Sequence, residues 1–288
     1  MPRSQPFPRH AGGMACMAGA SALFAVVDGL AKWLVVDYPL GQLLFFRSAF
    51  ALLPLLPLAI GAGRRGLASR RPLAHGLRAA IGLAALAAYF TAFRTETLAE
   101  VTAIGFAAPL MMTAFSALLL GETVGIRRWA AVAGGLLGVL LVLRPDAVAP
   151  GFGALAAVAG TALYALIMVL MRDMGRTESS VAIAFWFTVT ATILSAASLP
   201  WQWRAPTDGD LPLLAAIGIV GGVAQLLLAQ AVRLAPVSVV APVDYLYIVY
   251  ASAIGWLVWG DVPTATTLAG AALVAGCGLY VLEAERRT

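Results

Sequence analysis

Ten long apolar segments follow one another along this chain, with charge, proline or glycine between them. We place them at residues 12–36, 41–60, 74–93, 98–120, 127–143, 151–171, 179–199, 211–231, 236–258 and 264–282. Blocks of this length match helices that cross a hydrocarbon layer of about 30 Å. Strands of a membrane barrel would instead alternate apolar and polar residues over about ten residues. The pattern predicts an all-α integral membrane protein with ten transmembrane helices.

The composition agrees with a surface that faces lipid. Of the 288 residues, 61% are hydrophobic and 11% are charged, whereas a soluble domain has roughly 25% charged residues. The first apolar segment resembles a signal peptide, but it continues to Val36, which is too long for a signal core, so we expect it to be retained. Cys16 and Cys277 lie in separate apolar blocks and indicate packing residues rather than a disulfide framework.

The arginines predict how the chain is oriented, because cytoplasmic segments of membrane proteins are enriched in positive charge. With both termini in the cytoplasm, the outside loops hold three arginines, Arg94, Arg144 and Arg204. The inside segments hold fourteen: Arg3, Arg9, Arg64, Arg65, Arg70, Arg71, Arg78, Arg127, Arg128, Arg172, Arg176, Arg233, Arg286 and Arg287. This asymmetry supports an even number of crossings and explains the net charge of +5 without a nucleic-acid partner.

The two halves of the chain share an order of short motifs. Leu98-Ala99 opens the fourth segment and Gly121-Glu122 closes it, while Leu234-Ala235 opens the ninth and Gly260-Asp261 closes it. We therefore expect two five-helix repeats, residues 1–146 and 147–288. Five crossings are an odd number, so the second copy starts on the opposite side of the membrane. Inverted repeats of this kind are the usual architecture of secondary transporters, with the substrate site near the midplane.

Three stretches carry a resemblance to a known family. They are Asp28 to Lys32 with PLGQLLFFR at 39–47, LAEVTAIGFAAPLMMTAFSALLLGE at 98–122 with RRW at 127–129 and LRP at 143–145, and APVSVVAPVDYLYIVYASAIGWLVWGDVP at 235–263. Together they resemble the EamA-type ten-helix branch of the drug/metabolite transporter superfamily. The resemblance implies metabolite export, two cytoplasmic termini and a central cavity between the repeats, with YddG-type amino-acid exporters as the nearest functional class. Asp261 stands where that family usually has Glu, and we expect little consequence.

Charged residues inside a bilayer are costly and mark pathways or paired sites. Asp28 and Lys32 are four residues apart on one face of the first segment, and Arg47 lies in the second. In one interpretation Asp28 neutralises Lys32 or Arg47 and pins the two helices together. In another, the two cations and one anion form a site for a substrate carboxylate or an outer gate. In a third, Lys32 extends to the membrane surface.

A second acidic residue, Asp244, lies in the ninth segment with no basic residue close to it in sequence. It is a candidate to carry a coupling proton or to bind a substrate ammonium group. The alternative is a neutral carboxyl that bonds to a tyrosine or to backbone freed by Pro242. Pro242 and Pro109 interrupt the two segments that correspond between repeats, and each either lines a cavity or simply bends its helix.

Uncharged residues complete the predicted substrate site. Aromatic rings away from the segment ends provide an apolar wall: Tyr89, Phe106, Tyr164, Trp186, Tyr245 and Tyr247. Each of these rings, taken alone, is also explained by ordinary helix packing. Gln225 is a neutral polar group in the eighth segment and a candidate contact. No catalytic motif, metal-ligand spacing or phosphate-binding loop is present, so we expect no enzyme activity, no metal and no cofactor.

Our functional prediction is a secondary transporter that exports small metabolites, with aromatic or other neutral amino acids as the expected substrates, across a bacterial inner membrane by alternating access. The expected partners are the substrate and the lipid bilayer, and a monomer is the simplest form. Two alternatives remain. One is an exchanger of anionic metabolites from the same superfamily, which needs several cations in the cavity. The other is a polytopic membrane enzyme or sensor, which needs a catalytic cluster or an output domain.

Overall fold

The computed structural model describes residues 11–120, 125–143, 151–174, 177–235 and 237–286, and within these ranges the chain forms helices and no strands. The helices are α1 (Ala11–Leu34), α2 (Leu40–Leu67), α3 (Pro72–Ala92), α4 (Leu98–Gly105), α5 (Ala108–Leu120), α6 (Ile126–Leu143), α7 (Phe152–Met174), α8 (Ser180–Ala196), α9 (Leu211–Leu234), α10 (Val237–Asp244), α11 (Leu246–Trp259) and α12 (Ala265–Arg286). Gly121, Glu122 and the arginines at 3, 9, 144, 176 and 287 lie outside the described residues.

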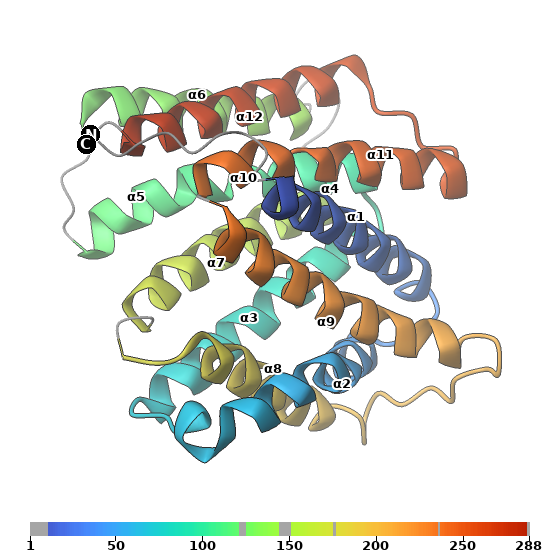
Figure 1. Ribbon diagram of the computed structural model, residues 1–288. Helices are drawn as coiled ribbons and strands as arrows, with labels where there is room; N and C mark the ends of the chain where they lie inside the picture. Colours follow the sequence, from blue (N-terminus) through green and yellow to red (C-terminus); the bar gives the residue numbers. More distant parts are fainter. Residues whose placement is uncertain (1–10, 121–124, 144–150, 175–176, 236, 287–288) are drawn as a thin grey trace.

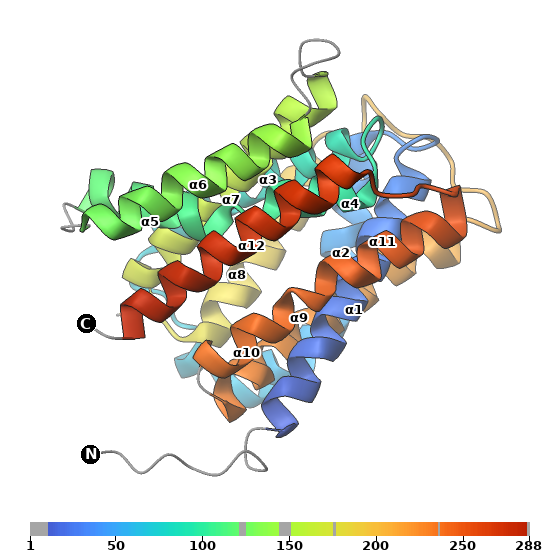
Figure 2. The same ribbon diagram turned by 90° about the horizontal axis from the view of Figure 1, so that it is seen from above.

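These helices make ten crossings, as the sequence predicts. Seven segments are long and apolar enough to span a membrane alone, and one of them, Leu98–Leu119, joins α4 and α5. Three shorter apolar helices, α8, α11 and α12, account for the remaining crossings, and α10 precedes α11 in the same crossing. Each crossing reverses the chain, so α12 ends at the same end of the bundle at which α1 begins (Figure 2). The fold is an all-α, multi-pass membrane bundle.

The fourth and ninth crossings are each divided into two helices. α4 ends at Gly105, and α5 begins at Ala108 with Pro109 as its second residue, where a missing N–H costs no helical hydrogen bond. In the ninth crossing α10 ends at Asp244 and α11 begins at Leu246. Pro242 lies three residues before this break. The prolines thus accompany both breaks, where Phe106 and Tyr245 keep right-handed helical dihedrals although the regular helix is interrupted.

α2 departs from a regular helix near its end. The expected segment stops at residue 60, but α2 continues to Leu67 through Gly63, which has φ +60° and ψ −175°. Positive φ is accessible to glycine without the strain that a side chain would introduce. This turn redirects the chain, so that the last residues of α2 reach the first residues of α8.

The most extensive helix pairings join the two halves of the chain. α1 packs on α9 and α11, α2 on α8 and α9, α3 on α7, and α6 on α12, whereas helices of the same half make smaller contacts with one another. Figure 1 shows α6 and α12 side by side along one edge, with α2 and α8 at the opposite edge. The two halves are therefore interlocked, and residues between them are supplied by both.

Glycines allow the closest of these approaches. A Cβ on Gly138 of α6 would lie 2.9 Å from the Gly270 carbonyl oxygen of α12, and a Cβ on Gly270 would lie 2.6 Å from the Gly138 carbonyl oxygen. Backbone atoms cannot move aside as a flexible side chain can. Small residues at such crossings are the usual means by which membrane helices pack, because lipid provides no hydrophobic force between them.

Candidate functional site

A polar cluster between the halves is built around Asp28 of α1. The Tyr247 hydroxyl of α11 donates a hydrogen bond to Asp28 Oδ2. Arg47 of α2 is the cation that acts electrostatically on Asp28, and the Arg47 Nε is buried without a hydrogen-bond acceptor in the described residues. The structure thus brings Asp28, Arg47 and Tyr247 together, and two of these three predicted residues come from one half and the third from the other.

Asp244 forms a second polar position at the end of α10. Its Oδ1 accepts a 2.8 Å hydrogen bond from the buried Ser21 hydroxyl of α1. Within the described part of the chain no cation forms an ion pair with Asp244. Ser21 and Asp28 are seven residues apart, which is about two turns of one helix face. α1 therefore carries one acidic residue, Asp28, and the hydroxyl partner of the other, Asp244.

Aromatic rings from both broken crossings lie beside this cluster. The ring centroid of Phe106, at the break between α4 and α5, is 4.7 Å from that of Tyr245 and 6.2 Å from that of Tyr247. Both distances are in the range of favourable aromatic pairs. A Cβ on Gly278 of α12 would lie 2.6 Å from the Tyr245 hydroxyl oxygen, so this ring extends toward α12. The breaks thus bring together aromatic residues far apart in sequence.

Two further tyrosines come from α3 and α7. The hydroxyls of Tyr89 and Thr161 share a 2.9 Å hydrogen bond. Tyr164 lies one turn beyond Thr161, is 42% exposed and is an electrostatic neighbour of Asp244. Tyr89 is likewise a neighbour of Asp28. These contacts connect α3 and α7 to both acidic positions.

The other predicted residues lie outside this cluster or contribute backbone. The Pro109 carbonyl accepts a 3.0 Å hydrogen bond from Thr113 within α5. Pro242 belongs to α10, two residues before Asp244. Gln225 of α9 is exposed, with no hydrogen bond to the described residues. The proline positions thus shape the backbone near the cluster, whereas no hydrogen bond joins Gln225 to the described residues of the cluster.

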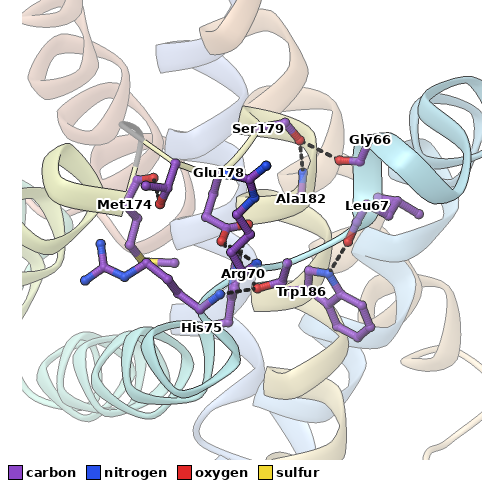
Figure 3. A network of polar contacts seen from close by, with 12 residues as sticks. Gly66, Leu67, Arg70, His75, Met174, Glu178, Ser179, Ala182 and Trp186 are labelled. Carbon is purple, nitrogen blue, oxygen red and sulfur yellow. Dashed lines mark hydrogen bonds and ion pairs between the residues drawn. The ribbon is translucent and has the colours of Figure 1, made fainter.

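Trp186 lies at a different place, where α8 meets the end of α2 (Figure 3). Its Nε1 donates a 2.8 Å hydrogen bond to the Leu67 carbonyl. The Ser179 hydroxyl, which caps α8, donates a 2.7 Å hydrogen bond to the Gly66 carbonyl. The structure therefore assigns Trp186 to the packing of two helix ends and does not bring it to the central cluster.

Beside Trp186, Glu178 joins the α2–α3 and α7–α8 connections (Figure 3). Glu178 Oε1 accepts a 2.8 Å hydrogen bond from the Arg70 backbone N–H, and Oε2 lies 3.5 Å from His75 Nε2. Burial raises the pKa of Glu178, but the Arg70 N–H and the His75 ring outweigh it and hold that pKa below its ordinary value. This buried carboxylate fastens the two halves together at one end of the bundle.

Lys32 also serves a contact between the halves. Its Nζ lies 2.8 Å from Asp261 Oδ2, donates a 3.1 Å hydrogen bond to the Glu96 carbonyl, and is 5.1 Å from the centroid of the Trp259 ring. Lys32 thus pairs with Asp261 and not with Asp28, its neighbour four residues away. Asp261 stands where the resembled family usually has Glu, and it still supplies the carboxylate that balances this lysine.

Arg78 is a residue that sequence analysis placed with the cytoplasmic arginines, yet it is 8% exposed inside α3. Its Nη2 donates to the Met171 sulfur at 3.3 Å, and its guanidinium carbon lies 4.3 Å from the centroid of the Phe187 ring. Its Nε and Nη1 are buried without acceptors in the described residues. One signal was available in the sequence, because Arg78 falls four residues inside the third apolar segment.

Two other features lie apart from the cluster. An open, mostly apolar groove of about 360 Å³ is lined by residues near the start of α6 and in the middle of α12, and none of the predicted site residues line it. Among the residues that the structure describes, no group of three or more His, Cys, Asp or Glu side chains gathers as metal ligands do. The polar chemistry of the bundle is concentrated between the halves.

Comparisons with known proteins agree with this architecture. The chain is 26% identical over 274 residues to a riboflavin transporter of Rhizobium johnstonii, covering 94% of this chain and 91% of the relative. It is 24% identical over 260 residues to an S-adenosylmethionine uptake transporter of Rickettsia bellii, covering 90% and 89%. It is 29% identical over 264 residues to the pseudopaline exporter CntI of Pseudomonas aeruginosa, covering 88% and 90%.

Structure and family comparisons give the same result. A solved crystal structure, 21% identical, matches with a TM-score of 0.65 over 95% of this chain and 98% of that one, which supports the fold. The EamA-like transporter family model matches twice, at residues 11–144 and 151–282. With both halves matched, and with a polar cluster between them, the chain belongs to the EamA-like transporter family.

Proposed function

We propose that this protein is a secondary transporter that moves small amphipathic metabolites out across a bacterial inner membrane by alternating access. The observation that carries the proposal is the central cluster, in which Asp28 and Arg47 come from the first half and Tyr247 and Asp244 from the second. Relative motion of the halves changes the distances between such groups. A substrate held by both halves is therefore coupled to that motion.

The proposal includes two repeats of opposite orientation and a bundle with both termini in the cytoplasm. Five crossings in each matched half, an odd number, require the second half to begin on the opposite side. The excess of arginine in the segments assigned to the cytoplasm supports an orientation with both termini on that side. Inverted repeats place a substrate site near the midplane, and the contact of Phe106 with Tyr245, one from each broken crossing, supports a site between the repeats.

Amino acids are the substrate class that we propose first. The relatives named above carry riboflavin, S-adenosylmethionine and pseudopaline, so the family accommodates chemically varied small molecules. In this chain the cluster combines carboxylates, a guanidinium and aromatic rings. Asp244 binds an ammonium group or carries a coupling proton, while Phe106, Tyr245, Tyr89 and Tyr164 form the wall against the apolar part of the substrate.

Exchange of anionic metabolites is a weaker reading of the same cluster. It requires several cations that are free to bind an anion. Lys32 forms an ion pair with Asp261, and Arg47 faces Asp28. Lys32 is thus balanced by an ion pair, and Arg47 is offset by the nearby charge of Asp28 without forming an ion pair among the described residues. The proposal involves no enzymatic step, no cofactor and no nucleic acid.

Flux measurements on purified protein in proteoliposomes test the proposal. Labelled amino acids, riboflavin and S-adenosylmethionine are compared, each with and without a pH gradient. We expect saturable flux of at least one class, and Asp244→Asn to remove its dependence on the gradient. Asp208→Asn, at an exposed position of the α8–α9 connection, is the matched control. Flux that never saturates for any compound would reject the proposal, and an unchanged gradient dependence in Asp244→Asn would remove the proton role.

A further inference from the structure

The cations inside the bundle differ in how they are balanced. Lys32, Arg47 and Arg78 are three cationic side chains of the described helices that are not exposed. Lys32 pairs with Asp261, and Arg47 faces Asp28. No carboxylate of the described residues pairs with Arg78, although Arg78 is the most buried of the three. The guanidinium charge of Arg78 therefore has no anionic partner among the described residues.

The neighbours of Arg78 cannot replace an anion. A thioether sulfur is a weak acceptor, and Nη2 donates only to Met171. The Phe187 ring accommodates a cation but accepts no hydrogen bond in the plane of the guanidinium. Guanidinium does not lose its proton in proteins. A buried charge without a partner is strongly unfavourable, so the unpartnered Nε and Nη1 of Arg78 favour a bound acceptor. Nη2 forms a planar fork with either of them, and a carboxylate that takes the place of the Met171 sulfur at Nη2 fits that fork.

Asp244 has the opposite deficiency. Its partner is the neutral hydroxyl of Ser21 at 2.8 Å, and no cation of the described residues pairs with it. One buried cation without an anion and one half-buried anion without a cation are therefore present in the same bundle. They belong to opposite halves, since Arg78 is in α3 and Asp244 is in α10.

Tyr164 of α7 is near enough to both positions to interact with each of them electrostatically. It is an electrostatic neighbour of both Arg78 and Asp244, which do not act directly on each other. Along α7, Tyr164 is seven residues from Met171, the neighbour of Arg78, and this spacing is about 10 Å on one helix face. With 42% of its surface exposed, Tyr164 has room for contact with another molecule.

We propose that Arg78 and Asp244 bind the two ends of a zwitterionic substrate, Arg78 its carboxylate and Asp244 its cationic nitrogen, with Tyr164 against the segment between them. This assignment rests on the proposed transport function and defines its substrate class. Because the two side chains do not reach each other, the charges of the substrate are separated by several bonds, as in an ω-amino acid. Met171, with three rotatable bonds, is the neighbour that moves aside when the carboxylate binds.

The test uses three probes that differ by one group each: ε-aminocaproate, hexylamine, which lacks the carboxylate, and caproate, which lacks the nitrogen. Dissociation constants are measured with full-length protein in detergent. In the wild type we expect ε-aminocaproate to bind about 10-fold or more tightly than either truncated probe, as a charge-assisted hydrogen bond provides. In Arg78→Gln the advantage over hexylamine disappears, and in Asp244→Asn the advantage over caproate disappears.

Two variants and one measurement keep the test decisive. Arg94→Gln removes an exposed arginine just beyond the end of α3 and retains wild-type discrimination. Arg78→Lys keeps the charge without the planar fork and loses part of the preference. Removal of an unpaired buried charge leaves the thermal unfolding temperature of ligand-free Arg78→Gln unchanged or higher. A lower temperature together with wild-type discrimination would show that Arg78 is structural and overturn the assignment.

The two proposals fail in different ways. If none of the three probes binds while another metabolite is transported, the zwitterion assignment is wrong and the transport function stands. If no metabolite of the flux panel gives saturable transport, the proposed function fails regardless of how Arg78 behaves.

Discussion

The contact of Lys32 with Asp261 allows a quantitative test of how the halves are joined. Lys32 makes a 2.8 Å ion pair with Asp261, a 3.1 Å hydrogen bond to the Glu96 carbonyl and a contact with the Trp259 ring. The two charged side chains are 13% and 28% exposed. Water therefore screens the pair only in part, and the pair contributes more to stability than a surface ion pair does.

The expected losses follow from the bonds that each substitution removes. Lys32→Met removes both hydrogen bonds and the ring contact and leaves Asp261 without its cation, which costs about 2–4 kcal/mol. Asp261→Asn retains an acceptor for Lys32 and loses the negative charge, which costs about 1 kcal/mol. In the double variant no charged carboxylate is left without a cation. We therefore expect the double variant to lose about 1–2 kcal/mol less than the sum of the two single variants.

The assay is reversible denaturant unfolding of the four proteins of this cycle in detergent micelles. Asp37→Asn is the matched control, because Asp37 pairs with Arg204 at 3.5 Å with both side chains 60% exposed. We expect less than about 0.5 kcal/mol for that variant. If the losses of Lys32→Met and Asp261→Asn simply add, the two side chains do not cooperate and the reasoning from their geometry is refuted.

Three further predictions use other contacts. The lowered pKa of Glu178 means that its stabilisation is present above the ordinary glutamate pKa and is lost as pH falls through the lower, folded value. The unfolding temperatures of wild type and Glu178→Gln should therefore converge between pH 7 and about pH 3, and parallel curves would contradict this. Gly138→Ala places a Cβ 2.9 Å from backbone and should cost about 1–3 kcal/mol in denaturant unfolding, whereas Gly276→Ala, with nothing within 4 Å, should be near neutral. Tyr247→Phe removes the bond to Asp28 and should weaken apparent substrate affinity about 10-fold in proteoliposome flux, and an unchanged affinity would place Tyr247 outside the site.

The crossings could be predicted from the sequence because each one depends on a local property. An apolar block must be long enough to span lipid, and its ends carry charge or helix-breaking residues. The eighth segment, expected at 211–231, is α9 at Leu211–Leu234. Pro109 and Pro242 also signalled correctly which two crossings are interrupted. They could not give the position of each break, which depends on how neighbouring helices accept the freed backbone.

Side-chain partners could not be predicted in the same way, because they are chosen by packing between distant helices. Lys32 has an acidic residue four positions before it, but its partner is Asp261, 229 positions away. Arg78 was counted with the arginines that face the cytoplasm, and only its burial against Met171 and Phe187 reveals that it is unbalanced. Charge spacing along one helix thus identifies candidates, while their pairing needs the fold.

The interlocked halves have a consequence for how the chain is made. When the ribosome has completed residues 11–143, five crossings have been made before the helices on which they mainly pack. α3 can dock once α7 emerges, α2 acquires its main neighbours with α8 and α9, and α1 acquires its main neighbour only with α9. α6 waits longest, since α12, the last 22-residue helix, must be synthesised before Gly138 is covered. Until then the small-residue faces of the first half lie against lipid or the insertion machinery, so the order of translation dictates the order of assembly.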